Sequence, residues 1–197
     1  MIKRILILLM ALMAADLTIA APRSVDAEKL DVAGVKLGMT PEEAASALVK
    51  TLGVSRKRIR FEKAIQANPV TKRKEIDILI LDADKASLKV YFEPNVPFNA
   101  RRKLSANLII YEQEWTPDNV ESMKQAALKK YGEPSNGTVS FVWEWCAEPS
   151  ENMGLGCSGF HGAVLKFGQT DLRLEDPKYK EAVNKFRNKM NSSRPIF

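Results

Sequence analysis

A capping residue followed directly by proline occurs three times in the chain, at 40–41, 116–117 and 176–177. Proline suits the first helical position, because its missing amide hydrogen would have no partner there. At the first site, Glu43 follows Thr40 by three positions, which is the pattern of a capping box, and Gly53 offers a stop. We therefore expect helices to begin at Pro41, Pro117 and Pro177.

Apolar residues recur at helical spacing after each of these starts, so each predicted helix has one apolar face. The residues are Ala45, Leu48, Val49 and Leu52, then Val120, Met123, Ala127 and Tyr131, then Tyr179, Ala182, Val183, Phe186 and Met190.

Between the predicted helices the apolar period changes to two, which is typical of strands. We expect strands at 75–81, 88–92, 104–115, 139–145, 163–167 and 172–174, with the arginine-rich stretch 56–63 as a further candidate. The alternation puts Ile76, Ile78 and Ile80 on one face, and likewise Leu104, Ala106, Leu108 and Ile110. Strands joined by tight turns pair antiparallel, so we expect an α+β fold, an antiparallel sheet with helices packed on one face.

The helix-then-strands order occurs twice, which indicates two tandem units within one globular body. We expect the first unit at 28–115 and the second at 116–197, the second with the C-terminal helix. The composition, 45% hydrophobic and 27% charged, suits a chain that buries a core.

The N-terminus has the pattern of a cleavable secretory signal. Lys3 and Arg4 precede an apolar run from Ile5 to Ala15, and a small-residue segment follows. We expect residues 1–20 to be removed, with cleavage after Ala27 as the alternative. A spanning anchor needs about 20 apolar residues, and Asp16 interrupts this one. We therefore expect export to the periplasm, or secretion as the alternative, with no transmembrane segment in the mature form.

Cys146 and Cys157 are the two cysteines of the chain, and in an exported protein such a pair indicates one disulfide. The first cysteine lies far from the predicted cut, so a lipid anchor at the new N-terminus is not expected. A redox-active pair would normally have two residues between its cysteines. We expect a structural bond here.

Positive charge is clustered in a chain of formal charge +6. The clusters are Arg56, Lys57, Arg58, Arg60 and Lys63, then 72–74, then 101–103. Such clusters attract polyanions through their summed field. After export, nucleic acid is not an expected partner, and the anions within reach belong to the envelope. The alternative is a solvated face that only keeps the protein soluble.

The segment Val32-Ala-Gly34-Val-Lys-Leu37-Gly38-Met39-Thr40-Pro41-Glu42-Glu43-Ala44 resembles the first element of the SmpA/OmlA envelope group and of the β-lactamase-inhibitor-protein-like fold. The resemblance extends over 32–53 and implies helices against one face of an antiparallel sheet. It implies non-catalytic binding through the open sheet face. The lipoprotein cysteine of SmpA/OmlA proteins is missing here, so a role in outer-membrane assembly is not carried over.

Catalytic chemistry has few candidate residues. His161 is the single histidine, and neither Ser158 nor Ser140 lies in a nucleophile motif. With both cysteines oxidised, His161 alone cannot hold zinc. The spacing of Asp82, Asp84 and Glu93 does not fit a calcium loop, because Ala86 and Ser87 stand where a ligand and a glycine are needed. We expect no catalytic residue, no metal and no cofactor.

An alternative function is a small cell-wall or glycan hydrolase that uses Glu112, Glu114 or Glu144 as paired carboxylates. A further alternative is a structural or stress-related envelope protein.

The preferred function is an exported, non-enzymatic protein that binds a protein or an anionic envelope component through its sheet face and basic loops. Trp143 and Trp145 are candidate contacts, since tryptophan and arginine dominate binding energy at interfaces. Arg101 and Arg102 would supply charge at the rim of that surface. The alternative for the two tryptophans is that they fill the core.

Overall fold

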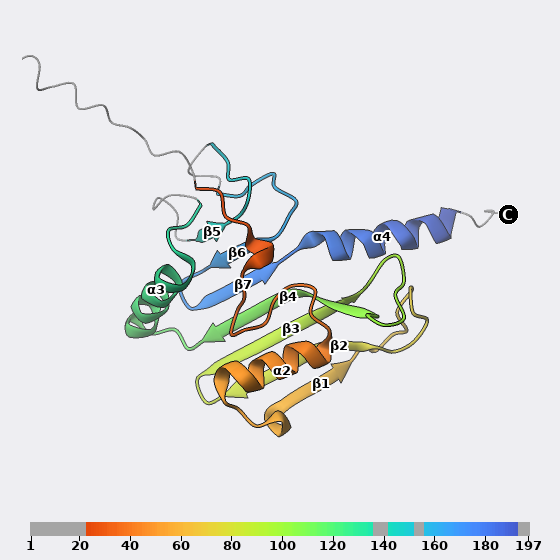
Figure 1. Cartoon of the computed structure of the whole chain (residues 1–197), viewed down its shortest axis with the longest axis horizontal. Coiled ribbons are helices and arrows are strands. Elements are labelled where there is room, and N and C mark those ends of the chain that lie inside the picture. The colour runs from red at the N-terminus through yellow and green to blue at the C-terminus, as the bar shows by residue number, and fades with distance from the viewer. Residues whose placement is uncertain (1–22, 136–141, 152–155, 193–197) are drawn as a thin grey trace, which may run out of the picture.

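Seven antiparallel strands form one continuous sheet in the described part of the chain, in the order β1-β2-β3-β4-β7-β6-β5 (Figure 1). The structure is a computed structural model that describes residues 23–135, 142–151 and 156–192. The prediction of an α+β fold with an antiparallel sheet is confirmed. The elements are η1 (Ala27–Lys29), α2 (Pro41–Leu52), η2 (Arg56–Arg58), β1 (Ile59–Lys63), β2 (Ile76–Ala83), β3 (Ala86–Pro94), β4 (Leu104–Gln113), α3 (Pro117–Tyr131), β5 (Trp143–Trp145), β6 (Val164–Phe167), β7 (Asp171–Glu175) and α4 (Pro177–Ser192).

All three α-helices begin at the predicted prolines, and side chains cap their first turns. The capping box of α2 is complete, because the Thr40 amide donates to Glu43 Oε2 at 2.8 Å and the Glu43 amide donates to Thr40 Oγ1 at 3.3 Å. Thr116 accepts from the amide of Asn119 at the start of α3, and Asp176 accepts from the amide of Lys178 at the start of α4. Each cap supplies an acceptor to an amide that the helix itself leaves unpaired.

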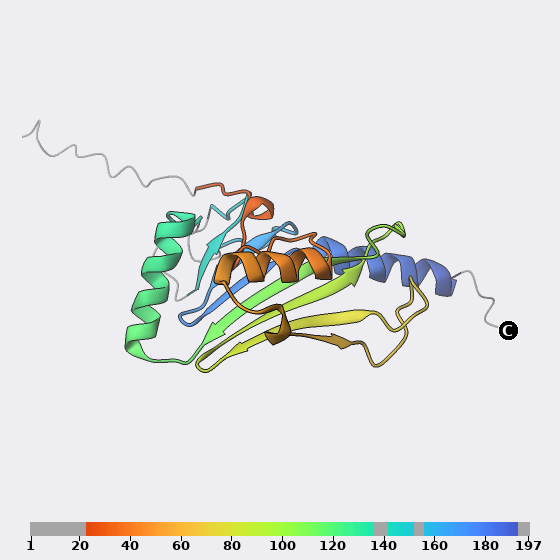
Figure 2. The same ribbon diagram turned by 60° about the horizontal axis from the view of Figure 1, so that its bottom comes forward.

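One face of the sheet carries the hydrophobic core. Cross-strand pairs such as Leu79 with Val90 and Ile109 with Leu174 continue this apolar face from β1 to β5. Helix α2 lies on this face, while α3 lies at the side of the molecule near β5, as Figure 2 shows. Ala44, Ala45 and Leu48 of α2 are buried there, as are Met123, Ala127 and Tyr131 of α3.

Two β-bulges change which apolar residues share a face of the sheet, compared with the faces that the sequence predicted. Glu62 pairs with Ile78 but Lys63 pairs with Ile76, so Asp77 is an extra residue in β2. Ile76 therefore packs against the core, whereas Ile78 and Ile80 lie on the opposite face, and the predicted common face of these three isoleucines is wrong.

The second bulge lies at Asn107 in β4. Tyr91 pairs with Leu108 and Phe92 pairs with Ala106, so Asn107 has no partner on β3. Leu104 and Ala106 belong to the core together with Ile109, while Leu108 and Ile110 do not, so the predicted single phase through β4 is also wrong.

The segment before α2 attaches this helix to the sheet. The Gly38 amide donates to the Ala106 carbonyl and the Ala106 amide donates to the Met39 carbonyl, both at 2.8 Å. Gly34 has a φ of +83°, and a Cβ there would lie 2.2 Å from Thr51 Oγ1. Glycine is therefore required at this position, by conformation and by space.

The strands of the first predicted unit, β1 to β4, are contiguous in the sheet, and so are β5 to β7 of the second. The two sets meet where β4 pairs with β7. The division at residue 116 stays a prediction.

Candidate functional site

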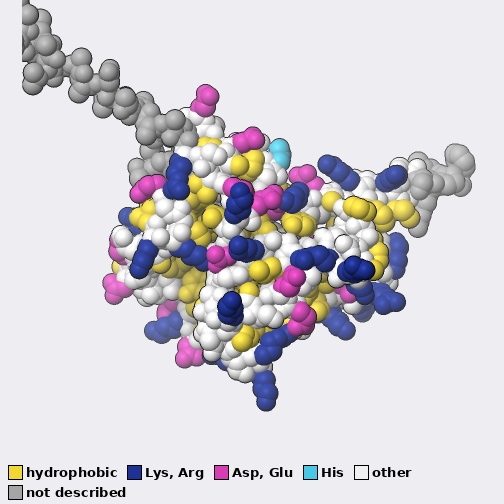
Figure 3. Space-filling model, viewed as in Figure 1, with side chains coloured by type: hydrophobic (Ala, Val, Ile, Leu, Met, Phe, Trp, Pro, Cys, Tyr) yellow, Lys and Arg dark blue, Asp and Glu magenta, His cyan; other side chains and the backbone are white. Residues whose placement is uncertain are grey.

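Two of the three basic clusters lie at the same end of the sheet. Antiparallel pairing brings together the loop 64–75 after β1, the loop 95–103 after β3 and the helix α4 (Pro177–Ser192) after β7. These segments contain respectively three, three and five Lys or Arg residues, against one, none and one Asp or Glu. We call the three segments the basic end. In Figure 3, Lys and Arg side chains gather over them at the right of the molecule.

The loop 64–75 is closed by hydrogen bonds to Asn68. The Lys72 amide donates to the Asn68 carbonyl at 2.9 Å, and the Asn68 amide donates to the Arg73 carbonyl at 2.8 Å. Asn68 Oδ1 also accepts from the Val70 amide. The exposed side chains of 72–74 thus project from a backbone that is held in place.

The loop 95–103 is held in the same way by two asparagines. The Asn95 amide donates to the Lys103 carbonyl at 3.0 Å, and its side chain donates to the Arg102 carbonyl. Asn99 Oδ1 accepts from the amides of Arg101 and Arg102. The peptide bond before Pro97 is cis.

The two arginines of this loop, both predicted as rim contacts, differ in their partners. Arg102 Nη2 lies 2.8 Å from Glu43 Oε2 and donates to the Gly38 carbonyl at 2.8 Å. The hydrogen bond from the Thr40 amide lowers the pKa of Glu43 against partial burial, and Arg102 lowers it further. The Arg101 side chain has no polar partner among the described residues, so it is the arginine of the pair that faces solvent unpaired.

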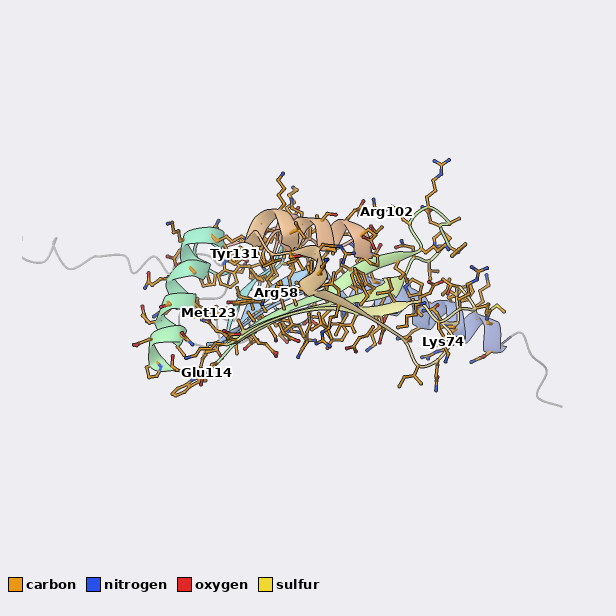
Figure 4. The ribbon with its side chains drawn as sticks, turned by 90° about the horizontal axis from the view of Figure 1, so that it is seen from below. Arg58, Lys74, Arg102, Glu114, Met123 and Tyr131 are labelled. Carbon is orange, nitrogen blue, oxygen red and sulfur yellow. A yellow bond between two sulfur atoms is a disulfide. The ribbon has the colours of Figure 1, made fainter. Side chains whose placement is uncertain are left out.

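The three arginines of the first basic cluster lie elsewhere and each has a partner. Arg60 contacts Asp82 at 2.6 Å and Arg58 donates to the Asp82 carbonyl at 2.9 Å. Arg56 contacts Glu42 at 2.9 Å and lies over the ring of Phe61. Figure 4 places Arg58 near the middle of the molecule and Arg102 and Lys74 at the basic end. These arginines stabilise the β1 side of the fold.

The face of the sheet opposite α2 carries charges that pair with one another. Lys89 contacts Glu112 at 3.4 Å, and Lys166 lies between Glu144 at 3.5 Å and Glu175 at 3.4 Å. Arg173 contacts Glu175 at 2.8 Å. Because opposite charges alternate across the strands, this face has little unbalanced charge.

The first turns of α4 shield Glu93 from solvent, in a pocket of about 450 Å³ that Lys180 also lines. Burial raises the pKa of the Glu93 carboxyl; Lys180 opposes this rise and Asp77 adds to it. Next to this pocket, Lys178 contacts buried Asp176 at 2.7 Å and Glu28 at 2.5 Å. Burial alone would lower the pKa of Lys178, but its hydrogen bonds to the two carboxylates raise it.

The candidate tryptophans belong to the core side of the sheet. Trp145 is 0% exposed, and its indole N–H donates to the Gly132 carbonyl at 3.1 Å. Trp143 is partly buried between the ring of Phe167 and the ammonium of Lys124, which lies 5.5 Å from its ring centre. Trp145 therefore fills the core, as the alternative expected. Its side chain has no exposed surface that a partner could contact.

The carboxylates of the hydrolase alternative are engaged in structural contacts. Glu144 Oε2 accepts from the Cys157 amide at 2.6 Å. Glu112 pairs with Lys89, and Glu114 lies 3.7 Å from Lys85. His161 and Ser158 are exposed, and Ser140 lies outside the described residues.

The predicted disulfide between Cys146 and Cys157 is present, with a Cα separation of 6.2 Å. The Cys146 amide donates to Ser135 Oγ at 3.0 Å, and the Cys146 carbonyl accepts from the Val25 amide at 2.7 Å. Backbone hydrogen bonds of Cys146 therefore hold the N-terminal segment and the residues after α3, and the disulfide connects them to Cys157.

An apolar groove of about 390 Å³ lies at the other end of the molecule from the basic end, next to α3. Met123, Tyr131, Tyr111, Leu172 and Leu52 line it. Figure 4 shows Met123 and Tyr131 on α3, far from Lys74. Tyr131 donates to the Asp31 carbonyl at 2.8 Å, and burial raises the pKa of its hydroxyl. The Tyr131 hydroxyl at the groove thus contacts the protein itself.

The described residues contain no group of three or more His, Cys, Asp and Glu side chains that could hold a metal. They also contain no helix with the length and apolar character that crossing a bilayer requires.

A scan against protein-family models, a search of curated proteins and a search of solved structures each found no match. The resemblance of 32–53 to the SmpA/OmlA group stays a prediction.

Sequence reasoning missed two features of the basic end, the exposed side chains of Ile65 and Phe98. The signal was present, since both are large apolar residues in segments that otherwise have loop composition. Arg101 was predicted, but its difference from Arg102 was not.

Proposed function

We propose that this chain is an exported, non-enzymatic protein of the periplasm whose basic end binds an anionic component of the cell envelope. The disulfide supports this placement, because such bonds persist in oxidising compartments. The leader of residues 1–20, which lies outside the described residues, has the composition that export requires.

One observation carries the proposal: the unpaired cations are concentrated at the basic end. In the described part of the chain, the side chains of five exposed residues in its two loops have no hydrogen bond or ion pair. They are Lys72, Arg73, Lys74, Arg101 and Lys103. In the first basic cluster, Arg56 and Arg60 pair with carboxylates, and the charges of the open sheet face pair with one another. The net attraction for a polyanion is therefore greatest at the basic end.

The site is built to attract an anion, with no feature for transforming one. Its cations project from two loops that asparagines hold, so few backbone groups need to be ordered on binding. All five are exposed, so salt screens them efficiently and the affinity will fall as ionic strength rises.

No observation favours the hydrolase alternative. Glu112 and Glu144 are each held by a lysine, and Glu144 also accepts the Cys157 amide. A carboxylate with these contacts stabilises the sheet and the disulfide loop.

The test is binding to inorganic polyphosphate at low and high salt, with the exported protein purified without reductant. The triple variant Lys72→Glu, Arg73→Glu and Lys74→Glu removes one basic loop. The matched control is Lys50→Glu, Lys57→Glu and Lys129→Glu, since these exposed lysines lie outside the basic end and have no side-chain partner among the described residues.

We expect the loop variant to bind about tenfold more weakly or worse, and the control to lose far less. Equal losses in the two variants would show that net charge alone attracts the polyanion. Failure of the wild-type protein to bind at low salt would refute the proposal.

A further inference from the structure

Three of the large apolar side chains that the described fold leaves exposed lie in the basic end. Ile65 in the loop 64–75 is 89% exposed, Phe98 in the loop 95–103 is 51% exposed, and Met190 near the end of α4 is 46% exposed. The others are Leu52, Trp115 and Val142, which lie in other parts of the fold. Each of the three belongs to a segment that also carries exposed Lys or Arg residues, and large apolar side chains exposed at one end of a folded protein indicate a contact surface.

Ile65 and Phe98, which we call the apolar tips, each lie in a loop that also carries unpaired cations. Ile65 lies two residues after Lys63 and precedes the basic run 72–74. Phe98 follows the cis peptide bond of the Val96-Pro97 pair and precedes Arg101 and Lys103. Both loops therefore offer the same combination, a large hydrocarbon side chain beside exposed positive charge.

A soluble polyanion would satisfy the cations but would leave the apolar tips in water. The surface of an anionic bilayer satisfies both, because phosphate groups accept from Lys and Arg while apolar side chains enter the boundary of the acyl chains. We infer that the basic end docks on an anionic lipid bilayer, with Ile65 and Phe98 inserted below the headgroups. This inference rests on the proposed function and names the anionic component.

The arrangement of the loops suits a flat surface. Both loops and α4 project at one end of the molecule in Figure 1 and again in Figure 2, turned by 60°. Helix α3 and the apolar groove lie away from that end. The protein would therefore stand end-on, with its groove and the part of the sheet face that α4 does not cover still open to other molecules.

The backbone of both loops is already ordered before insertion, because hydrogen bonds hold the base of each loop. The Ala64 amide donates to the Glu75 carbonyl at 3.0 Å at the base of one loop, and the Asn95 amide donates to the Lys103 carbonyl at the base of the other. Ser105 donates to Asn95 Oδ1 at 2.9 Å and fixes that asparagine in turn. Little conformational freedom is lost when the tips enter the bilayer, so the apolar contact adds to affinity.

The test is partition of the exported, processed protein onto phosphatidylcholine vesicles with and without an equal part of phosphatidylserine. The variant Ile65→Ser with Phe98→Ser keeps every charge. The matched control is Leu52→Ser with Trp115→Ser, which removes two exposed apolar side chains elsewhere. Binding of each protein to inorganic polyphosphate is measured alongside.

We expect binding to the phosphatidylserine vesicles only. The tip variant should bind them about tenfold more weakly, while the control and all polyphosphate affinities stay unchanged. Equal vesicle binding by the tip variant and the wild type would overturn insertion, and so would equal binding to pure phosphatidylcholine. Binding to polyphosphate without binding to vesicles would overturn the inference and leave the proposed function standing. Binding to neither would remove both.

Discussion

Arg102 and Glu43 lie 59 positions apart in sequence and meet through two contacts, Nη2 to Oε2 at 2.8 Å and Nη1 to Oε1 at 3.3 Å. The same carboxylate completes the capping box with Thr40. This pair therefore joins the loop 95–103 to the first turn of α2. Arg101, the neighbouring residue, makes no such contact in the described structure, so the two arginines have separable roles.

The change Arg102→Ala should lower the free energy of unfolding by about 0.2 to 1 kcal/mol, the range for an ion pair that solvent reaches. The change Arg101→Ala should leave it unchanged but weaken binding to polyphosphate. Urea denaturation and a binding titration of the two variants check this. Equal effects on stability would mean that Arg102 does not hold the loop.

Glu93 should make stability depend on pH. Burial raises its pKa above the unfolded value of 4.5, so the folded state binds more protons than the unfolded state between the two values. Stability contributed by this group therefore falls as pH rises through that window. The change Glu93→Gln should raise the melting temperature at neutral pH, and the gain should vanish below the ordinary glutamate pKa. A gain that persists at low pH would argue against titration of Glu93 as its cause.

Reduction of the disulfide should destabilise the protein by up to about 3 kcal/mol, the chain-entropy value for a short closed loop. The bonded cysteines are 11 positions apart and both are buried. Urea denaturation with and without reductant measures the loss. The double variant Cys146→Ser with Cys157→Ser is the control and should not respond to reductant. A wild-type midpoint that reductant leaves unchanged would show that the bond constrains little.

Processing of the leader should occur after Ala20 and not after Ala27. Arg23 donates to the Glu133 carbonyl, Ser24 donates to the Ala147 carbonyl and the Val25 amide donates to the Cys146 carbonyl, so a cut after Ala27 would remove three contacts with the folded body. Ala27 itself is buried. Intact-mass measurement of the exported protein decides between the sites. An N-terminus at Glu28 would contradict this expectation.

Local sequence signals were sufficient where the responsible residues are neighbours. The pairs at 40–41, 116–117 and 176–177 predicted all three α-helix starts, because capping involves residues within one turn. The strand at 171–175 was predicted from Leu172 and Leu174, and the strand at 59–63 from the alternation of Ile59 and Phe61.

The face on which a strand residue lies, and the residue with which it pairs, depended on parts of the chain that are distant in sequence. The bulges at Asp77 and Asn107 arise from registers with β1 and β3, which no local period reveals. The candidate site shows the same limit. Arg60 and Arg101 both lie in basic runs of the sequence. Asp82 neutralises Arg60 across the sheet, whereas Arg101 has no ion pair in the described structure. Composition predicted positive charge, and only the fold identified which charges are unpaired.

Lysine footprinting locates the binding surface most directly. The protein is acetylated with and without bound polyphosphate, and the modified residues are identified by mass spectrometry. Binding at the basic end predicts protection of Lys72, Lys74 and Lys103, with Lys50, Lys57 and Lys129 modified equally in both samples. Protection of the second set, or equal protection of both, would contradict it.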